Sequence, residues 1–356
     1  MAKKFIKSRK RREQTIAIII VAAVVLLITA GLLIWVASKN ENIGEHDHDH
    51  ENWVEAEVTL RVGMSYEEGD THYASVKAFK DEVESRTSGA VRVEILSSDK
   101  TVLDEAMISE IASQKDTVDI VVSNVSNFTG IDARMDISSL PFLFDGYESA
   151  WKFMDGEIQK EIEKDLIKRN IRVLAYYSDG FEAMTTTKDV ISNGENVKNK
   201  NFAMSEESSS AITLHAMNAR TVVLGSNAIV QALQNGTCHG YVGTIESIYS
   251  TRAYQVQKYM SLTYHTYDAI AFAISEEVWQ RLSEDQQNAV SYAAQNSSFT
   301  DRQNVRQQEE AIVQKIESAG VQIIHPKRTS FYESANAVMR GLRDTYGSLI
   351  DRVLLK

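Results

Sequence analysis

The alternation of apolar and polar positions becomes regular after Glu57. Residues 58–64, "VTLRVGM", and residues 91–96, "VRVEIL", alternate with the period of a strand. The segment between them, "THYASVKAFKDEVESRTSG", places apolar residues at helical spacing and ends at Gly89, a common helix stop. This order predicts a strand, a helix and a second strand joined in one βαβ unit.

The same alternation continues along the chain. "VLDEAMISEIASQ" predicts a helix, and "VDIVVS" predicts a short strand that ends in polar residues. Further segments of both kinds follow as far as "AIAFAIS", and after Glu276 the pattern is mostly helical, interrupted by the strand-like "VQIIHP". Strands that alternate with helices indicate an α/β fold with a mostly parallel sheet and helices on both faces. The extent of the pattern suggests two α/β lobes.

An uncharged apolar run lies near the start of the chain, at residues 15–36. Its 22 residues would reach roughly 33 Å as a helix, enough to cross a bilayer. We expect an uncleaved transmembrane anchor, because a signal peptide has an apolar region of only about 7–15 residues, although "WVAS" offers a weak cleavage pattern. By the positive-inside rule the basic residues 1–14 would stay in the cytoplasm, and the main domain would be extracytoplasmic.

A polar segment, residues 37–56, separates this run from the first predicted strand. It contains "HDHDH", in which His46, His48 and His50 alternate with two aspartates. Imidazole and carboxylate groups both bind divalent metals, so the tract is a candidate metal site. We favour a solvated linker, because no scaffold orients these groups and their spacing matches no closed structural site.

Charge, cysteine content and missing motifs narrow the function. The formal net charge is −11, and seven Lys or Arg residues gather at the N-terminus, so the rest of the chain is more acidic still. Such a chain does not suit nucleic-acid binding. The single cysteine, Cys238, forms no intramolecular disulfide. No nucleophile elbow, phosphate-binding loop, dinucleotide fingerprint or H-E-x-x-H motif is present, so we expect neither an enzyme nor a cofactor.

The segment at residues 138–156, "SSLPFLFDGYESAWKFMDG", points to a family. It resembles the signature of the DctP-type solute-binding proteins of tripartite ATP-independent periplasmic (TRAP) transporters. "FKDEVESRTSGAVRVEIL", "IRVLAYYSDGFEAMTTTK", "ALQNGTCHGY" and "IYSTRAYQVQKYMSLTYH" are similar to the same family in order and spacing, from about Val58 to the C-terminus. Within the signature, "LPFLF" reads as a buried strand end, and the helix after Gly146 is expected to pack into the core.

The resemblance implies a two-lobed, periplasmic-binding-protein-like fold, with two α/β lobes around a cleft. We expect lobe 1 at residues 57–178, with part of 267–356 returning to it, and lobe 2 at 179–266. A mostly helical segment at 276–356 would pack on both lobes.

The resemblance also implies a receptor that closes around a small-molecule solute and delivers it to TRAP permease membrane subunits. The alternative is a family descendant without a transport role, acting as a surface-anchored interaction or sensing module.

The resemblance places the ligand site where this chain departs from its relatives. Family members carry an arginine that pairs with a ligand carboxylate, and the matching strand "VKNKNFAMS" has Ala203 at that position. Gly243 stands where the family has a ligand-contacting asparagine, and Glu182 stands where many relatives have a basic residue. The candidate ligand-binding residues are Tyr177, Phe181, Glu182, Ala203, Ser205, Tyr241, Gly243 and His265.

These departures change the expected ligand. A buried carboxylate without its cationic partner is disfavoured by about 3–5 kcal/mol, so a simple organic acid is a poor candidate. A neutral polyhydroxylated or a cationic ligand fits better. The alternative is that Arg61, Arg134 or Arg220 supplies the lost positive charge from elsewhere.

Overall fold

The computed structural model describes residues 53–96, 104–115, 117–205 and 209–354, and Val54–Lys356 groups into one compact unit. The predicted anchor and the histidine tract lie outside the described residues. Within the described residues, no helix combines the length and the apolar character needed to cross a bilayer. In the same part of the chain, no group of three or more His, Cys, Asp or Glu residues is placed to hold a metal ion.

The first elements form the predicted βαβ unit. β1 (Val58–Met64), α2 (Thr71–Arg86) and β2 (Val91–Ile95) follow one another, and β1 is parallel to β2. α3 (Asp104–Ala112) precedes β3 (Ile120–Asn124), which pairs in parallel with the other edge of β1. The hydrophobic periodicity therefore predicted these elements correctly.

Two long elements organise the rest of the chain: the strand β4 (Ile171–Thr186) and the helix α10 (Glu284–Ser318). The other elements, in chain order, are η3 (Val125–Phe128), η4 (Ala133–Ser139), α4 (Tyr147–Met154), α5 (Glu157–Ile167), η5 (Gly194–Val197), β5 (Asn201–Met204), α6 (Ser209–Ala216), β6 (Arg220–Val223), α7 (Ser226–Gln234), β7 (Gly240–Thr244), α8 (Ile245–Ser250), η6 (Ala253–Val256), β8 (Tyr259–Ser261), β9 (Tyr267–Ser275), α9 (Glu276–Arg281), β10 (Gln322–Ile324), η7 (Arg328–Phe331), α11 (Tyr332–Gly341), α12 (Arg343–Tyr346) and α13 (Leu349–Leu354).

The strands form one sheet in the order β2-β1-β3-β9-β4-β7-β5-β6, with β8 paired to β4 and β10 paired to β8. The pairs β1–β2, β1–β3, β5–β6, β5–β7 and β8–β10 are parallel. β9 is antiparallel to β3 and β4, and β4 is antiparallel to β7 and β8. The expectation of a mostly parallel sheet is therefore only partly right, because β4 and β9 run against the parallel sets that they join.

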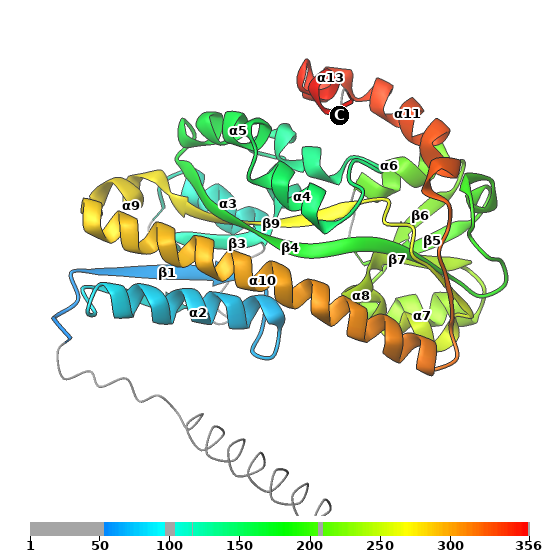
Figure 1. Ribbon diagram of the computed structural model, residues 1–356, viewed down its shortest axis with the longest axis horizontal. Helices are drawn as coiled ribbons and strands as arrows, with labels where there is room; N and C mark the ends of the chain where they lie inside the picture. Colours follow the sequence, from blue (N-terminus) through cyan, green and yellow to red (C-terminus); the bar gives the residue numbers. More distant parts are fainter. Residues whose placement is uncertain (1–52, 97–103, 116, 206–208, 355–356) are drawn as a thin grey trace, which may run out of the picture. The chain divides into compact units, whose positions relative to one another are not determined.

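β4 changes partner along its length. Residues 171–181 pair with β9, and residues 182–186 pair with β7. We call lobe 1 the part built on β1, β2, β3 and the first section of β4, and lobe 2 the part built on β5, β6, β7, β8 and the last section of β4. α10 contacts β4, and both elements run through the two parts (Figure 1). The residue boundaries predicted for the lobes remain predictions.

The sheet is covered on both faces, as the alternating pattern requires. In β3, Ile120 and Val122 join the core that α2 covers, whereas Val121 between them joins the core under α3, α4 and α5. In α2, Val76, Phe79 and Val83 are fully buried at helical spacing. Lobe 2 has a core on each face of its own strands as well.

α10 ties the two lobes together with a partly polar face. Ser283 begins the helix with a capping box, in which its hydroxyl accepts from Gln286 N. The helix packs against α2 in lobe 1 and α8 in lobe 2. Its buried side chains include Asp301, Arg302 and Glu309, which bond to groups beside or on β4.

The "LPFLF" segment differs from its prediction as a strand end. The structure places Pro141 and Phe142 in a turn after η4, and Phe142 has a left-handed backbone with φ 56°. The Phe142 N–H donates to the carbonyl oxygen of His265 at 2.7 Å. The apolar run is buried because it turns beneath the chain that enters β9, and it joins no strand of the sheet.

Candidate ligand-binding cleft

A cavity of about 260 Å³ lies between the two lobes. Lobe 1 contributes the end of β1, the start of α3 and the end of β3, and lobe 2 contributes the ends of β5 and β7 and the start of α8. β4 and β9 pass behind the cavity. The lining residues are Ser65, Tyr66, Asp104, Asn124, Asn127, Asp179, Glu182, Met204, Ser205, Val242, Gly243, Thr244, Glu246, Ser247 and Asp268.

The described lining is acidic. Asp104, Asp179, Glu182, Glu246 and Asp268 bring five carboxyl groups to the cavity, and the described lining includes no lysine or arginine. Carboxyl groups that face one cavity repel one another unless a cation or a hydrogen-bond donor lies between them. The described lining of the cavity is therefore rich in negative charge.

Asp104 is held by donors of lobe 1. Ser123 Oγ donates to its Oδ2 at 2.6 Å, and the Ser65 hydroxyl donates to its Oδ1. Asn127 Nδ2 donates to Ser123 Oγ at 2.9 Å and completes the cluster. Because these donors already satisfy Asp104, its side chain has a fixed position at the cavity wall.

Asp179 belongs to a buried charge group beneath the cleft. His72 of α2 places Nε2 at 3.5 Å from Asp179 Oδ1 and Nδ1 at 2.9 Å from Asp301 Oδ2. Burial favours the neutral ring, but the hydrogen bonds and charges of Asp179 and Asp301 outweigh it and raise the pKa of His72 to about 10. At neutral pH an imidazolium therefore lies between two carboxylates.

Glu182 lies on β4 at the point where that strand changes partner. Its side chain is 3% exposed, and its Oε2 lies 3.3 Å from His265 Nε2. His265 is fully buried and places Nδ1 2.8 Å from Thr263 Oγ1 and Nε2 3.1 Å from Ser210 Oγ. His265 thus lies beside the buried carboxylate, and hydroxyl groups contact both of its ring nitrogens.

The lobe 2 wall is made of hydroxyl groups around a glycine. Tyr241 OH lies 3.0 Å from Ser205 Oγ and donates to Ser247 Oγ at 3.2 Å. A Cβ on Gly243 would lie 2.5 Å from Ser247 Oγ and 2.9 Å from Tyr241 OH. Glycine at this position therefore leaves room for the hydroxyl cluster.

A second cavity, of about 350 Å³, adjoins the first between α2, α8 and α10. The two cavities share Tyr66, Asp179 and Glu246. Desolvation raises the pKa of Glu246, and the carboxylates of Asp179 and Asp70 raise it further, although its side chain still reaches water. The acidic character therefore continues beyond the first cavity.

The structure brings some of the predicted residues to the cavity and keeps others away from it. Glu182, Ser205 and Gly243 line it, and Tyr241 and His265 lie directly behind lining residues. The other three pack in cores: Tyr177 bonds to Ser297 of α10 at 2.8 Å, Phe181 packs against Tyr147, Tyr264 and Tyr267, and Ala203 is fully buried. The roles of all eight in ligand binding remain predictions.

Sequence reasoning missed most of the lobe 1 wall. Three residues of this wall lie at the ends of elements next to the cavity: Tyr66 follows β1, Asn124 ends β3, and Asp104 begins α3. The carboxyl ends of parallel strands are the usual ligand edge of an α/β sheet, so polar residues just after β1 and β3 were a usable signal. Asp179 and Asp268 lie on β4 and β9, which pair antiparallel, so this signal did not apply to them.

The arginines considered as substitutes for the missing charge do not line the cavity. Arg61 forms a two-pronged pair with Asp119, at 2.9 and 3.0 Å. Arg134 pairs with Asp132 and Asp165, and Arg220 lies exposed on the edge strand β6. Arg61 and Arg134 are paired with aspartates elsewhere and Arg220 lies on the surface, so none of the three brings a positive charge to the cleft.

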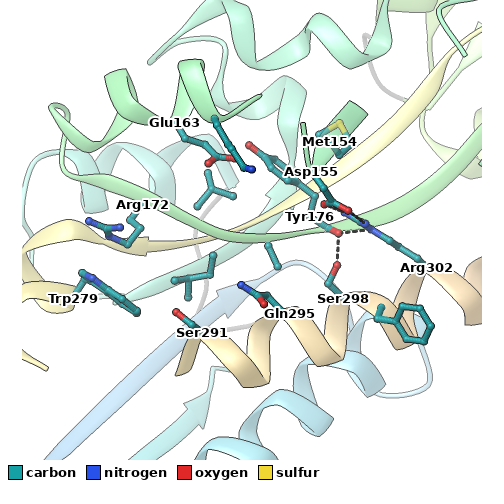
Figure 2. Close-up of a pocket in the computed structure, with 15 residues that line it drawn as sticks. Met154, Asp155, Glu163, Arg172, Tyr176, Trp279, Ser291, Gln295, Ser298 and Arg302 are labelled. Atoms are coloured by element: carbon teal, nitrogen blue, oxygen red, sulfur yellow. Dashed lines mark hydrogen bonds and ion pairs between the residues drawn. The ribbon is translucent and has the colours of Figure 1, made fainter. Parts of the chain in front are cut away.

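A larger cavity, of about 520 Å³, opens on the other side of β4 (Figure 2). Two of its charged groups have partners: Arg302 pairs with Asp155 at 2.8 and 2.9 Å, and Arg172 pairs with Glu276. Its lining comes from α4, α5, β4, α9 and α10, without a contribution from β5 to β8. Closure of two lobes would not enclose a ligand there, so we place the candidate site in the cleft.

Comparison with known proteins agrees with this geometry. The model of the family described as bacterial extracellular solute-binding protein, family 7 (DctP) matches residues 62–344. The 2,3-diketo-L-gulonate-binding periplasmic protein YiaO of Escherichia coli is 24% identical over 269 residues, which cover 76% of this chain and 81% of that protein. The C4-dicarboxylate-binding protein DctB of Bacillus subtilis is 22% identical over 283 residues, with coverage of 75% and 80%.

Solved structures show the same fold. A TRAP periplasmic solute-binding protein of Ochrobactrum anthropi gives a TM-score of 0.80 at 22% identity, covering 84% of this chain and 94% of that one. A second, from Polaromonas and bound to D-erythronate, gives a TM-score of 0.72 at 25% identity, with coverage of 83% and 98%. The two-lobed fold and the family model over most of the chain lead to one conclusion: this protein belongs to the bacterial extracellular solute-binding proteins of family 7, a family of solute receptors.

Proposed function

We propose that this chain is the extracytoplasmic receptor of a TRAP-type secondary transporter, tethered by a membrane helix at residues 15–36, and that its cleft takes a cationic solute. The observation that carries the proposal is the cavity between the lobes, which five carboxyl groups line. A solute there contacts both lobes at once, so it stabilises the closed arrangement more than an open one. Delivery to the permease subunits then follows from recognition of the closed form.

The charge of the cleft argues against an acidic ligand. Several solved relatives hold acids, among them D-erythronate in one and succinate in another. In this chain a ligand carboxylate would face Glu182, Asp179 and Asp268 with no arginine or lysine in the described lining. Burying a charge beside like charges costs several kcal/mol, which hydroxyl contacts do not offset.

A neutral sugar also fits the lining less well than a cation. Hydroxyl groups could bond to Ser205 and Ser247, but they would leave the buried charge of Glu182 without compensation from the ligand. A cationic group both bonds to the carboxylates and offsets their charge. The sequence suggested two ligand classes, a neutral polyhydroxylated molecule and a cation. The charge of the described lining favours the cation.

Titration of the purified full-length chain in detergent tests the proposal. We expect saturable heat on adding small amines such as ethanolamine or 1,3-diaminopropane, and none with succinate or D-glucuronate. An amine at 100 times its dissociation constant should add about 2.7 kcal/mol to the free energy of unfolding. Binding of a carboxylate without binding of any amine would contradict the proposed ligand class.

A further inference from the structure

The buried pair of Glu182 and His265 carries an inference about how the cleft selects its ligand, which rests on the proposed function. We propose that Glu182 is the residue that selects the charge of the ligand and that His265 is its positioning residue, with a proton on Nε2. The ligand cation must then carry N–H groups, as an ammonium does, because a carboxylate oxygen recognises it by hydrogen bonding.

The position of Glu182 makes it the least adjustable acid of the cleft. Its backbone is fixed on both sides, since its N–H donates to Thr266 O at 3.0 Å and it pairs with Thr244 across β4 and β7. The side chain lines the cavity while remaining only 3% exposed. Because so little water reaches this carboxylate, its free energy depends on the polar groups of the protein and the ligand around it.

The surroundings of His265 decide which ring nitrogen carries the proton. Nε2 faces the Glu182 carboxylate at 3.3 Å, and a carboxylate only accepts. An unprotonated Nε2 would bring two sets of lone pairs together, so the proton lies on Nε2. Thr263 Oγ1, at 2.8 Å from Nδ1, can donate to the other nitrogen. The ring therefore presents an N–H toward Ser210, with the Glu182 carboxylate 3.3 Å away beside it.

The neighbours of His265 differ from those of His72. His72 lies between the carboxylates of Asp179 and Asp301, which is an arrangement for an imidazolium. His265 has hydroxyl oxygens on both nitrogens and a single carboxylate. The His265 ring is therefore held mainly by hydroxyl groups, beside the Glu182 carboxylate.

The backbone around His265 is fixed as well. Its carbonyl oxygen accepts from Phe142 N at 2.7 Å, and the rings of Phe142 and His265 lie 6.3 Å apart. Tyr264, just before it, has a left-handed backbone with φ 46°. The turn that contains Phe142 therefore holds His265, and His265 in turn orients Glu182.

The rest of the lining favours an ammonium over a quaternary cation. Quaternary cations are recognised by the faces of several aromatic rings. Tyr66 is the single aromatic side chain in the described lining, and its ring already lies 4.6 Å from the ring of His72. Oxygen acceptors dominate the wall instead, and they need N–H donors.

Matched pairs of amines and their trimethylated forms test the inference on the full-length chain. Isothermal titration would compare ethanolamine with choline, and 1,3-diaminopropane with its bis-trimethylammonium form. We expect each amine to bind at least about tenfold more tightly than its methylated partner. Equal or tighter binding of the methylated forms would overturn the inference and leave the cationic class intact, whereas failure of all cations would overturn both.

Substitutions separate positioning from folding. Glu182→Gln should weaken amine binding by at least about tenfold, and Glu317→Gln, the same change on the exposed end of α10, should not. His265→Gln keeps an amide donor and should retain affinity within about threefold, whereas His265→Leu should lose about tenfold or more. Equal affinity of the Gln and Leu variants would contradict the positioning role.

A spectroscopic measurement avoids the risk that a variant fails to fold. The ¹⁵N chemical shifts of His265 in the unmodified protein distinguish a proton on Nε2 from a proton on Nδ1. We expect a protonated Nε2 and an unprotonated Nδ1 near pH 7.5, with and without ethanolamine. A proton on Nδ1 alone, or on both nitrogens, would overturn the proposed arrangement.

Discussion

Gly180 shows how a single missing side chain shapes the middle of β4. The residue lies at an irregularity in the β4–β9 pairing and has a left-handed backbone with φ 95°. The carboxyl group of Glu309 occupies the adjacent space and accepts from Phe181 N at 3.3 Å. Burial raises the pKa of Glu309 to about 8, against the opposing bonds from Tyr147 and Phe181, so this acid is largely protonated at neutral pH.

We therefore expect Gly180→Ala to destabilise the protein. The added Cβ would lie 2.0 Å from Glu309 Oε1, and the positive φ adds backbone strain. Together these effects should lower the free energy of unfolding by about 1–3 kcal/mol, measured by urea denaturation. Gly130→Ala is the matched control, because a Cβ at Gly130 meets nothing within 4 Å. An equal effect of both substitutions would contradict this account.

At the residue scale, the sequence predicted the buried helix faces better than the cleft. Val76, Phe79 and Val83 were predictable because burial repeats with the helical period. Asp179 and Asp268 were not, since a polar residue inside an apolar strand reads as a solvent-facing position until the partner strands are known. The cleft depends on which strands lie side by side, and that information is absent from local periodicity.

At the scale of elements, α2, β4 and α10 meet at one charged contact. His72 of α2 lies between Asp179 of β4 and Asp301 of α10, and Asp301 also accepts from Ser178 N at 3.1 Å. The contact joins a lobe 1 helix to the strand and the helix that both lobes share. It replaces apolar packing where the cleft begins, and it makes stability depend on pH.

Stability should fall as the pH rises through the range in which His72 loses its proton. The pKa of His72 is raised from 6.5 to about 10, so the stabilisation is complete below about pH 6.5 and is lost as the pH approaches 10. In that interval this group contributes a slope of about −1.4 kcal/mol per pH unit to the free energy of unfolding.

Urea denaturation from pH 6 to pH 9 measures that slope. His72→Gln should flatten the curve, whereas His215→Gln, at an exposed histidine of α6, should leave it unchanged. A wild-type slope that survives His72→Gln would assign the pH dependence to other groups.

Element prediction succeeded for the strands and helices with a clear period and failed for one apolar segment between η4 and α4. The β1–α2–β2 unit and the long α10 follow directly from periodicity and end signals. The "LPFLF" segment was wrongly predicted as a strand end, because an apolar run with a proline looks the same in a strand and in a buried turn. Phe142 has a left-handed backbone, and its N–H donates to the carbonyl oxygen of His265, which lies more than a hundred residues further along the chain.

At the scale of the whole molecule, the predicted anchor would set where the receptor works. Protease added outside intact cells should remove nearly everything after Ser38 and leave a membrane-embedded stub, because the basic residues before the apolar run hold the N-terminus inside. Immunoblotting with tags at both ends would follow the two fragments, with a cytoplasmic protein as the control for intact cells. Mature protein that begins near Lys39 in the soluble fraction would show cleavage instead.

The course of β4 also bears on how such a receptor acquires a new ligand in evolution. The chain passes between the two lobes in β4, returns in β9, and spans both again in α10. Recombination at one junction therefore cannot exchange an intact lobe for that of a relative, since each exchange would mismatch at least one shared element. We therefore expect new specificity to arise by point substitution of the side chains that face the cleft, and the role proposed for Glu182 is one such case.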